Sequence, residues 1–228
     1  MLSLKHLTKV YRTTEVETTA LRGLELDVAP GEFLAIMGPS GCGKSTLLNI
    51  VGMLDSPSGG EYWFADQNIA GWSEGQLSEL RKNSIGFIFQ SFNQVDDLTV
   101  FENVEQALLY HKDLPPRDRK ARVHASLENM KAAHRAKHRP QQLSGEQQQR
   151  VAIARATVSR PKLRLADEPT GNRDSAMGEE VMQLRTELNQ QWTTIVMVTH
   201  SLAHAEYAHR IVHLLDGSIV TDRVRQAV

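Results

Sequence analysis

Residues 38–45 have the glycine spacing that a phosphate-binding loop requires. They read Gly-Pro-Ser-Gly-Cys-Gly-Lys-Ser and match the pattern G-x-x-x-x-G-K-S/T at every fixed position. Glycines allow such a loop to wrap closely round a phosphate and to turn its backbone N–H groups inward. In this pattern we expect Lys44 to hold the β- and γ-phosphates of a nucleotide and the Ser45 hydroxyl to bind Mg²⁺.

The segments on either side of the loop supply the context that the motif needs. Phe33–Met37 is a short continuous apolar run, typical of a strand buried on both faces. Residues 45–51 read as a helix, and its start near Lys44 adds a positive dipole end. A chance glycine-rich turn would lack this strand, loop and helix.

Two adjacent carboxylates follow a second apolar run later in the chain. Leu163–Asp167 reads as a buried strand that ends at Asp167 and Glu168. The carboxyl ends of strands in a parallel α/β sheet face the ligand, so Asp167 would support Mg²⁺ and Glu168 could activate water as a general base. The alternative is a solvated acidic turn, which an isolated Asp-Glu pair would favour.

A further helix start could face an anion. Residues 143–150 read Leu-Ser-Gly-Glu-Gln-Gln-Gln-Arg and precede an alanine-rich helix. Ser144 and Gln147 are spaced as a capping box, which predicts Ser144 as the N-cap residue. Thr99 and Glu102 have the same spacing, which predicts Thr99 as the N-cap residue of an earlier helix.

With this segment the chain resembles the ABC ATPase family, whose signature motif is Leu-Ser-Gly-Gly-Gln. Further elements of the family follow in the expected order: Tyr11 where an aromatic ring stacks on adenine, Gln90 in the glutamine loop, residues 171–174 as the D-loop, and His200 as the switch histidine. Each element is weak alone, because a lone histidine or glutamine after a strand is usually structural. All of them in the family's order are a specific match, and the resemblance covers essentially the whole chain.

The resemblance implies roles for individual residues. The catalytic set would be Glu168, His200, Gln90 and Lys44. The ATP contacts would be Tyr11, Gly38, Ser40, Gly41, Cys42, Gly43, Lys44, Ser45, Thr46, Ser144, Gly145, Gln147 and Asp174. The Mg²⁺ ligands would be Ser45, Gln90 and Asp167.

The pattern of segments predicts an α/β fold. We expect a P-loop NTPase core, with a RecA-like, mostly parallel sheet and an antiparallel β subdomain, interrupted by an α-helical subdomain. The predicted division assigns residues 1–89 and 159–228 to the core and residues 90–158 to the helical subdomain, within one domain of residues 1–228. Residues 211–215 and 218–221 flank Asp216 and Gly217, a strong two-residue hairpin signal.

Composition excludes some classes of protein. Lys and Arg number 26 against 27 Asp and Glu, a net charge of -1 that argues against nucleic-acid binding. The single cysteine, Cys42, fits a reducing compartment. No stretch approaches the roughly 18 apolar residues of a membrane span, and no secretion signal is apparent at the N-terminus. We therefore expect a cytoplasmic protein that works at a membrane only through a partner.

The resemblance also implies a mechanism and partners. Two copies would form a homodimer with each ATP between one phosphate loop and the other copy's signature motif, and hydrolysis would drive a separate membrane permease from its cytoplasmic face. Residues 20–23, 31–41 and 165–172 are most similar to the lipoprotein-releasing and macrolide-export type, which would export or extract lipoprotein, peptide or drug. The alternatives are a cell-division ATPase that signals through a permease-like partner without transport, and a soluble non-transport ABC ATPase.

Three residues depart from the family pattern. Glu146 replaces the second glycine of the signature, where its charge would either follow the helix dipole and point away or repel the partner copy's ATP. Arg164 interrupts an apolar strand and should find a carboxylate or reach outward. Arg173 stands in the D-loop where the family usually has an apolar residue. Cys42 could be a reactive thiol that ATP protects, although a small tolerated side chain is the simpler interpretation.

Overall fold

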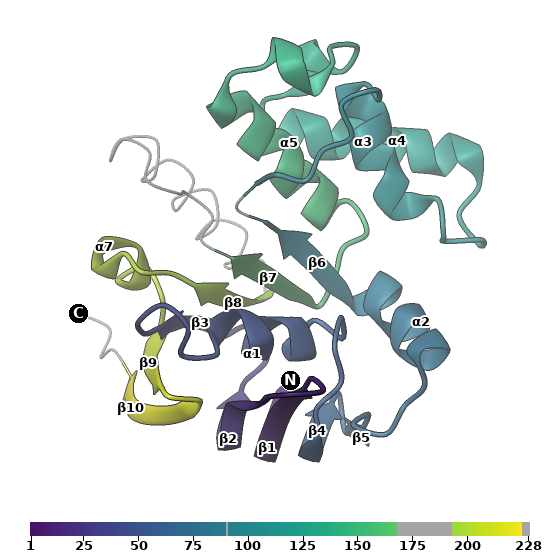
Figure 1. The fold of residues 1–228 in the computed structure, drawn as a ribbon. Coiled ribbons are helices and arrows are strands. Elements are labelled where there is room, and N and C mark those ends of the chain that lie inside the picture. Colours follow the sequence, from purple (N-terminus) through teal and green to yellow (C-terminus); the bar gives the residue numbers. More distant parts are fainter. Residues whose placement is uncertain (90, 168–192, 225–228) are drawn as a thin grey trace.

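The computed structural model describes residues 1–89, 91–167 and 193–224 (Figure 1). A six-stranded sheet has the order β10-β9-β3-β8-β7-β6. Its strands are β3 (Phe33–Met37), β6 (Ile85–Ile88), β7 (Leu163–Asp167), β8 (Thr194–Val198), β9 (Arg210–Leu215) and β10 (Ser218–Val224). All neighbouring pairs are parallel except β9 and β10, which form the hairpin predicted at Asp216-Gly217.

A second, antiparallel sheet lies beside the first and has the order β2-β1-β4-β5. Its strands are β1 (Leu2–Arg12), β2 (Glu17–Val28), β4 (Gly59–Phe64) and β5 (Gln67–Asn68). The described helices are α1 (Lys44–Val51), α2 (Glu74–Ser84), α3 (Val100–Glu105), α4 (Pro116–Asn129), α5 (Gly145–Thr157) and α7 (Leu202–Ala205), with 3₁₀ turns at Gln106–Leu108, Ala133–Arg135 and Pro140–Gln142. This mixture confirms the predicted α/β architecture with two kinds of sheet.

Strand β3 separates two cores because both of its faces are buried. Leu34 and Ile36 belong to the core that α1 and the antiparallel sheet share. Phe33 and Ala35 belong to the core beneath α3, α4 and α5. The alternation of side chains along a strand therefore places α1 and the helical layer on opposite faces of the six-stranded sheet, and Figure 1 shows the helical layer and the antiparallel sheet on opposite sides of that sheet.

The helical layer lies between β6 and β7 in the chain, and two of its helices, α3 and α5, begin at the predicted caps. Thr99 and Glu102 form a capping box at the start of α3, with Thr99 Oγ1 accepting from the Glu102 N–H at 3.2 Å. Ser144 and Gln147 form the same arrangement at the start of α5. Both caps confirm predictions made from spacing alone. None of the helices in the described ranges is long and apolar enough to cross a membrane.

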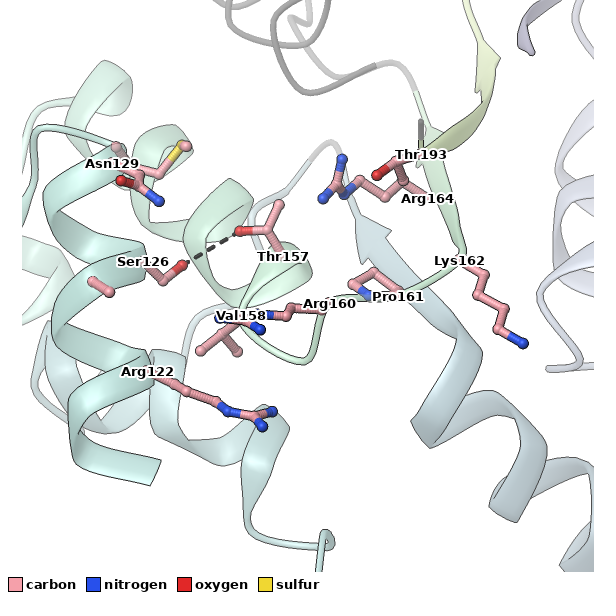
Figure 2. A pocket seen from close by; sticks show the side chains of 12 residues that line it. Arg122, Ser126, Asn129, Thr157, Val158, Arg160, Pro161, Lys162, Arg164 and Thr193 are labelled. Atoms are coloured by element: carbon pink, nitrogen blue, oxygen red, sulfur yellow. Dashed lines mark hydrogen bonds between the residues drawn. The ribbon is translucent and has the colours of Figure 1, made fainter. Parts of the chain in front are cut away.

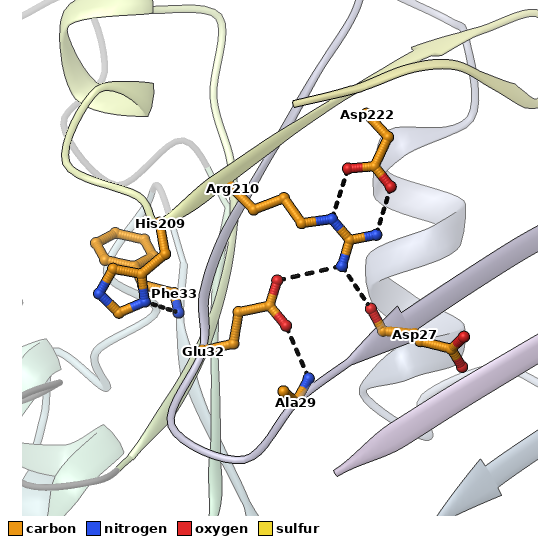
Figure 3. A network of polar contacts seen from close by, with 7 residues as sticks. All are labelled: Asp27, Ala29, Glu32, Phe33, His209, Arg210 and Asp222. Atoms are coloured by element: carbon orange, nitrogen blue, oxygen red, sulfur yellow. Dashed lines mark hydrogen bonds and ion pairs between the residues drawn. The ribbon is translucent and has the colours of Figure 1, made fainter. Parts of the chain in front are cut away.

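A polar network fastens the β9–β10 hairpin to the rest of the core (Figure 3). The Arg210 guanidinium donates to both carboxylate oxygens of Asp222 at 2.5 Å, to Glu32 Oε1 at 3.2 Å and to the Asp27 carbonyl at 2.8 Å. Glu32 in turn accepts from the Ala29 N–H at 2.7 Å. Because these residues lie on β2, the turn into β3, β9 and β10, the network joins the two sheets at one edge.

Candidate functional site

Strand register brings the predicted phosphate loop, Asp167 and His200 to one edge of the central sheet. Asp167 on β7 pairs with Val198 on β8, and Val198 pairs with Ile36 on β3. The phosphate loop starts two residues after Ile36, and His200 follows two residues after Val198. Because these strands are parallel, all three segments leave the sheet at its carboxyl edge, where α/β proteins bind ligands.

Two glycines of the loop are required by close backbone approach. A Cβ on Gly38, whose φ is +153°, would lie 2.2 Å from the Leu214 carbonyl oxygen. A Cβ on Gly43, whose φ is +106°, would lie 2.5 Å from the Ala20 carbonyl oxygen. The loop is therefore held between β9 and β2, and neither position tolerates a side chain.

The Lys44 side chain is buried within the loop. Its ammonium donates to the carbonyls of Gly38 at 2.9 Å and Pro39 at 2.7 Å, and only 6% of the residue is exposed. Gly43 is the N-cap residue of α1 and has no side chain that could accept from the first N–H groups of the helix. Those N–H groups and the ammonium are together the donors that a phosphate chain requires.

The neighbouring oxygens fit a magnesium ion. Ser45 is exposed in the first turn of α1, and Asp167 is partly exposed at the end of β7. Magnesium typically binds one or two protein oxygens and completes its octahedron with phosphate oxygens and water. No cluster of three or more His, Cys, Asp or Glu side chains that could hold a metal occurs among the described residues.

Backbone hydrogen bonds hold His200 at the same edge. The N–H of Thr199 donates to the Ile36 carbonyl at 3.2 Å, so the segment after β8 stays beside β3. The Thr199 hydroxyl accepts from the Ser201 N–H at 3.1 Å. His200 lies between these fixed residues and is exposed to solvent, where a bound phosphate could reach it.

Tyr11 lies one strand away from the phosphate loop. It pairs with Thr18 on β2, and Ala20 of β2 is the residue that approaches Gly43. The residue is 42% exposed, and its hydroxyl donates to Asp55 Oδ2 at 3.0 Å. This placement suits a ring that stacks on a base whose phosphates lie in the loop.

Helix α5, which begins at the signature segment, packs in the core of the helical layer and not in the core that contains α1. α5 packs against α3, α4 and β6, whereas α1 packs against β2, β7 and β8. Ser144 is exposed and caps the helix, with Gly145 and Gln147 in its first turn. The phosphate loop and the signature segment thus belong to opposite faces of the sheet.

The β9–β10 turn supports the phosphate loop in a way that its hairpin signal did not indicate. The Gly217 N–H donates to the Cys42 carbonyl at 3.0 Å, and the Arg22 N–H donates to the Gly217 carbonyl at 2.9 Å. Hairpin signals describe only local pairing, so this long-range contact had no signature in the sequence. Cys42 itself is 4% exposed, which favours the interpretation of a small tolerated side chain over that of a reactive thiol.

Arg164 does not reach into open solvent. It is 6% exposed, and it lines a cavity of about 580 Å³ together with Arg122, Arg160 and Thr193 (Figure 2). Burial lowers the pKa of Arg164 to about 10. Arg164 and Thr193 lie near the amino ends of β7 and β8, so this cavity is not the nucleotide site.

Several predicted residues lie outside the described part of the chain. They are Gln90, Glu168, Arg173 and Asp174. The loop residues Ser40, Gly41 and Thr46 are described and occupy the segment between β3 and the first turn of α1.

Comparison with known proteins places this geometry among ATP-binding cassettes. A family model described as "ABC transporter" matches residues 21–171. A macrolide export ATP-binding/permease protein, MacB, of Azoarcus sp. (strain BH72) is 46% identical over 222 residues, which are 97% of this chain but only 34% of that protein. An uncharacterized ABC transporter ATP-binding protein of Bacillus subtilis (strain 168), YvrO, is 44% identical and is covered over 96% of its length.

Solved structures agree with the sequence comparison. The ATP-binding cassette MJ0796, solved as a dimer in a post-hydrolysis state bound to ADP and Pi, superposes with a TM-score of 0.91 at 41% identity, covering 100% of both chains. The structure of cbiO1 from Clostridium perfringens, described as part of the ABC transporter complex cbiONQ, gives a TM-score of 0.86 at 29% identity over 97% of this chain and 87% of that one.

Proposed function

The chain belongs to the ABC transporter family as an ATP-binding cassette, and from this membership we propose that it hydrolyses ATP as one half of a nucleotide-sandwich dimer that drives a membrane permease. The observation that carries the proposal is the phosphate loop, in which Gly38 and Gly43 are packed against neighbouring backbone and Lys44 is buried among the loop carbonyls. That loop sits at the carboxyl edge of the sheet with Asp167 and His200 beside it.

Dimerisation follows from the separation of the two anion-binding helix starts. The N-terminus of α1 is on the core shared with the antiparallel sheet, and that of α5 is on the core of the helical layer. A second copy, turned head to tail, can present its Ser144 to the phosphates held by Lys44. Two positive helix ends then share one anion, so ATP favours the closed dimer and loss of the γ-phosphate weakens it.

Within each site the residues divide the work. Lys44 and the loop N–H groups would hold the β- and γ-phosphates, and Ser45, Gln90 and Asp167 would hold Mg²⁺. When bound, the ion neutralises phosphate charge during transfer. Glu168 takes a proton from the attacking water, and His200 donates a hydrogen bond to the γ-phosphate. In the dimer, Gly145, Gln147 and Asp174 contribute from the partner copy.

The permease docks at a cleft between the core and the helical layer. This cleft has a volume of about 810 Å³ and lies beside β6, immediately before Gln90 in the chain. The rings of Phe87 and Phe89 stack at 5.3 Å, and Leu54 and Tyr110 on its lining are 44% and 73% exposed. Exposed apolar side chains around a groove suit a helix from a protein partner. Docking there would hold the cassette at the inner face of the membrane.

The transport subtype rests on likeness alone. One relative is named as a macrolide export protein, and this chain spans 34% of its length. By likeness to that relative, we propose that the system assembled from this chain and its permease exports a drug, peptide or lipoprotein. The predicted helical subdomain, residues 90–158, would carry the signature segment and one side of the docking cleft, whereas β6 and α2 of the predicted core would form the other side. Neither the cell-division nor the soluble alternative has an observation of its own.

The test uses a variant that binds ATP but cannot activate water. We expect Glu168→Gln to elute as a dimer from a sizing column with Mg-ATP and as a monomer without it, and to retain little turnover. Lys44→Ala is the matched control, which should remain monomeric in both conditions because it loses phosphate binding. A Glu168→Gln protein that stays monomeric at saturating ATP would overturn the sandwich mechanism.

A further inference from the structure

Two charged side chains that have been given no role so far contact Tyr11, whose ring we propose stacks on adenine. We propose that Asp55 and Lys9 are positioning residues that fix the Tyr11 ring and leave one face of it for the base. The inference rests on the proposed function, because it takes Tyr11 as the stacking residue.

Asp55 holds both of the other side chains. Its Oδ2 accepts from the Tyr11 hydroxyl at 3.0 Å, and its Oδ1 accepts from Lys9 Nζ at 2.5 Å. Lys9 Nζ also donates to the Ser56 carbonyl at 2.7 Å. Both carboxylate oxygens are therefore used, one to fix the hydroxyl end of the ring in place and one to anchor the ammonium that lies against its face.

The ammonium covers one face of the ring. Lys9 Nζ lies over Tyr11 at 4.9 Å from the ring centroid, within the range of a cation–π contact. Lys9 and Tyr11 are two residues apart on β1, so their side chains leave the strand on the same side. The Lys9 side chain is 12% exposed, so it is held against the ring rather than free in solvent. With this face occupied, a base can stack only on the other.

The cluster is also joined to the phosphate loop through the backbone. Lys9 pairs with Leu21 on β2, and Leu21 is one of the residues that a Cβ on Gly43 would meet, at 3.1 Å. Asp55 follows the end of α1, and its N–H donates to the Asn49 carbonyl of that helix at 3.3 Å. The helix that begins at the phosphates thus leads to the carboxylate that fixes the base-stacking ring.

Asp55 carries a negative charge at neutral pH, which holds the cluster together. Burial raises the pKa of Asp55, but the hydrogen bonds from Lys9, Tyr11 and the Ser56 backbone outweigh burial and hold that pKa below its ordinary value. Asp55 is therefore ionised at neutral pH and balances the charge of Lys9. The ammonium is then directed to the ring and not to the nucleotide phosphates.

The experiment compares two probes, ATP and inorganic tripolyphosphate, by calorimetric titration of the full chain. Asp55→Ala, Lys9→Met and Tyr11→Phe should each weaken ATP binding about threefold to tenfold, the loss that one net hydrogen bond or cation–π contact produces. Tripolyphosphate has no base, so its affinity should stay within about twofold of the wild-type value in every variant. The Asp55→Ala/Tyr11→Phe double variant should be no weaker than the worse single variant, because both changes remove the same hydrogen bond.

Tyr11→Ala separates failure of this inference from failure of its premise. If Tyr11→Ala weakens ATP binding but Asp55→Ala, Lys9→Met and Tyr11→Phe do not, the ring stacks without positioning help and the inference is overturned. If Tyr11→Ala also leaves ATP affinity unchanged, the stacking role itself is wrong. Equal losses for ATP and tripolyphosphate would show a general distortion of the loop and would likewise overturn the inference. Should Asp55→Ala not fold, Lys9→Met and Tyr11→Phe decide the matter by the same criteria.

Discussion

Glu146 Oε1 accepts two hydrogen bonds from the Arg150 guanidinium, from Nη2 at 2.9 Å and from Nε at 3.0 Å. Arg150 lies one turn further along α5, in the orientation that favours a Glu-to-Arg pair at this spacing. The carboxylate that replaces the second glycine of the signature is therefore bound along the helix. This bond favours the first of the two alternatives for Glu146, in which its carboxylate follows the helix and points away from the phosphates of a partner copy.

Arg150 should consequently be needed for ATP-driven dimerisation, because it holds the Glu146 carboxylate along the helix. In Arg150→Met the Glu146 carboxylate is released near the partner's ATP, and repulsion of about 1 kcal/mol or more should reduce ATP-driven dimerisation about fivefold or more. Light scattering with ATP, in the Glu168→Gln background, measures the dimer fraction. The double variant Glu146→Gly/Arg150→Met is the control and should recover dimerisation. If it dimerises as poorly as Arg150→Met alone, the loss comes from other Arg150 contacts, such as the 3.4 Å bond to the Met130 carbonyl.

Gly43 should be intolerant of even one methyl group. A Cβ would lie 2.5 Å from the Ala20 carbonyl oxygen at a φ of +106°, so Gly43→Ala must displace the loop from β2. We expect ATP affinity, measured by titration, to fall at least about tenfold, because the N–H groups at the start of α1 turn away from the phosphates. Gly71→Ala is the matched control, since nothing lies within 4 Å of its Cβ. Wild-type affinity in Gly43→Ala would contradict the geometry of the loop.

Local signals in the sequence predicted the parts of the fold that local chemistry decides. The run Phe33–Met37 is β3 with the predicted bounds, because a short apolar run before a glycine-rich turn is typical of a strand covered on both faces. The capping boxes at Thr99 and Ser144 formed because each polar side chain satisfies backbone N–H groups of its own helix. Asp216-Gly217 made its hairpin because both residues adopt positive φ.

Relationships between distant segments could not be predicted in this way. Spacing gave no indication that Gly217 would donate to Cys42, or that Asp167, Val198 and Ile36 would share one row of the sheet. Register depends on the packing of whole strands, which no single residue encodes. Asp55 escaped notice because a carboxylate after a helix has no distinctive neighbours in sequence. Its side-chain partners, Lys9 and Tyr11, lie more than forty positions away.

The segment before α3 should depend on one buried amide. Asn103 is fully buried, and its Oδ1 accepts from the Val95 N–H at 2.8 Å. Its Nδ2 lies within 3.0–3.2 Å of the Val95, Leu98 and Thr99 carbonyls. Asn103→Leu keeps the volume but removes the amide that pairs with the Val95 N–H and the Leu98 carbonyl, whereas the Val95 and Thr99 carbonyls keep backbone partners. The free energy of unfolding should therefore fall by about 2–4 kcal/mol.

Urea denaturation followed by circular dichroism measures that change. Asn83→Leu is the control, because its amide bonds to Glu79 on the surface of α2 and its loss should change stability by less than about 0.5 kcal/mol. Equal effects of the two substitutions would show that the Asn103 network does not stabilise the fold.

Acid should weaken the fastening of the β9–β10 hairpin at Asp222. The hydrogen bonds from Arg210 are the main cause that lowers the pKa of Asp222 below its ordinary value of 3.8. A carboxyl with a lowered folded-state pKa stabilises the fold above its unfolded pKa, and that stabilisation is lost as the pH falls through the folded-state value. The difference in unfolding free energy between the wild type and Asp222→Asn should therefore be constant from about pH 5 to 8 and shrink below about pH 4.

The size of that difference is limited by exposure, because 43% of the Asp222 side chain is open to solvent. We expect no more than about 1 kcal/mol at neutral pH, measured by urea denaturation at pH 7, 5 and 3.5. Glu17→Gln, which breaks the pair between Arg12 and a side chain that is 55% exposed, is the control and should have a smaller effect. A difference for Asp222→Asn that widens toward pH 3.5 would mean that the carboxylate destabilises the hairpin, contrary to the bonds that Arg210 makes with it.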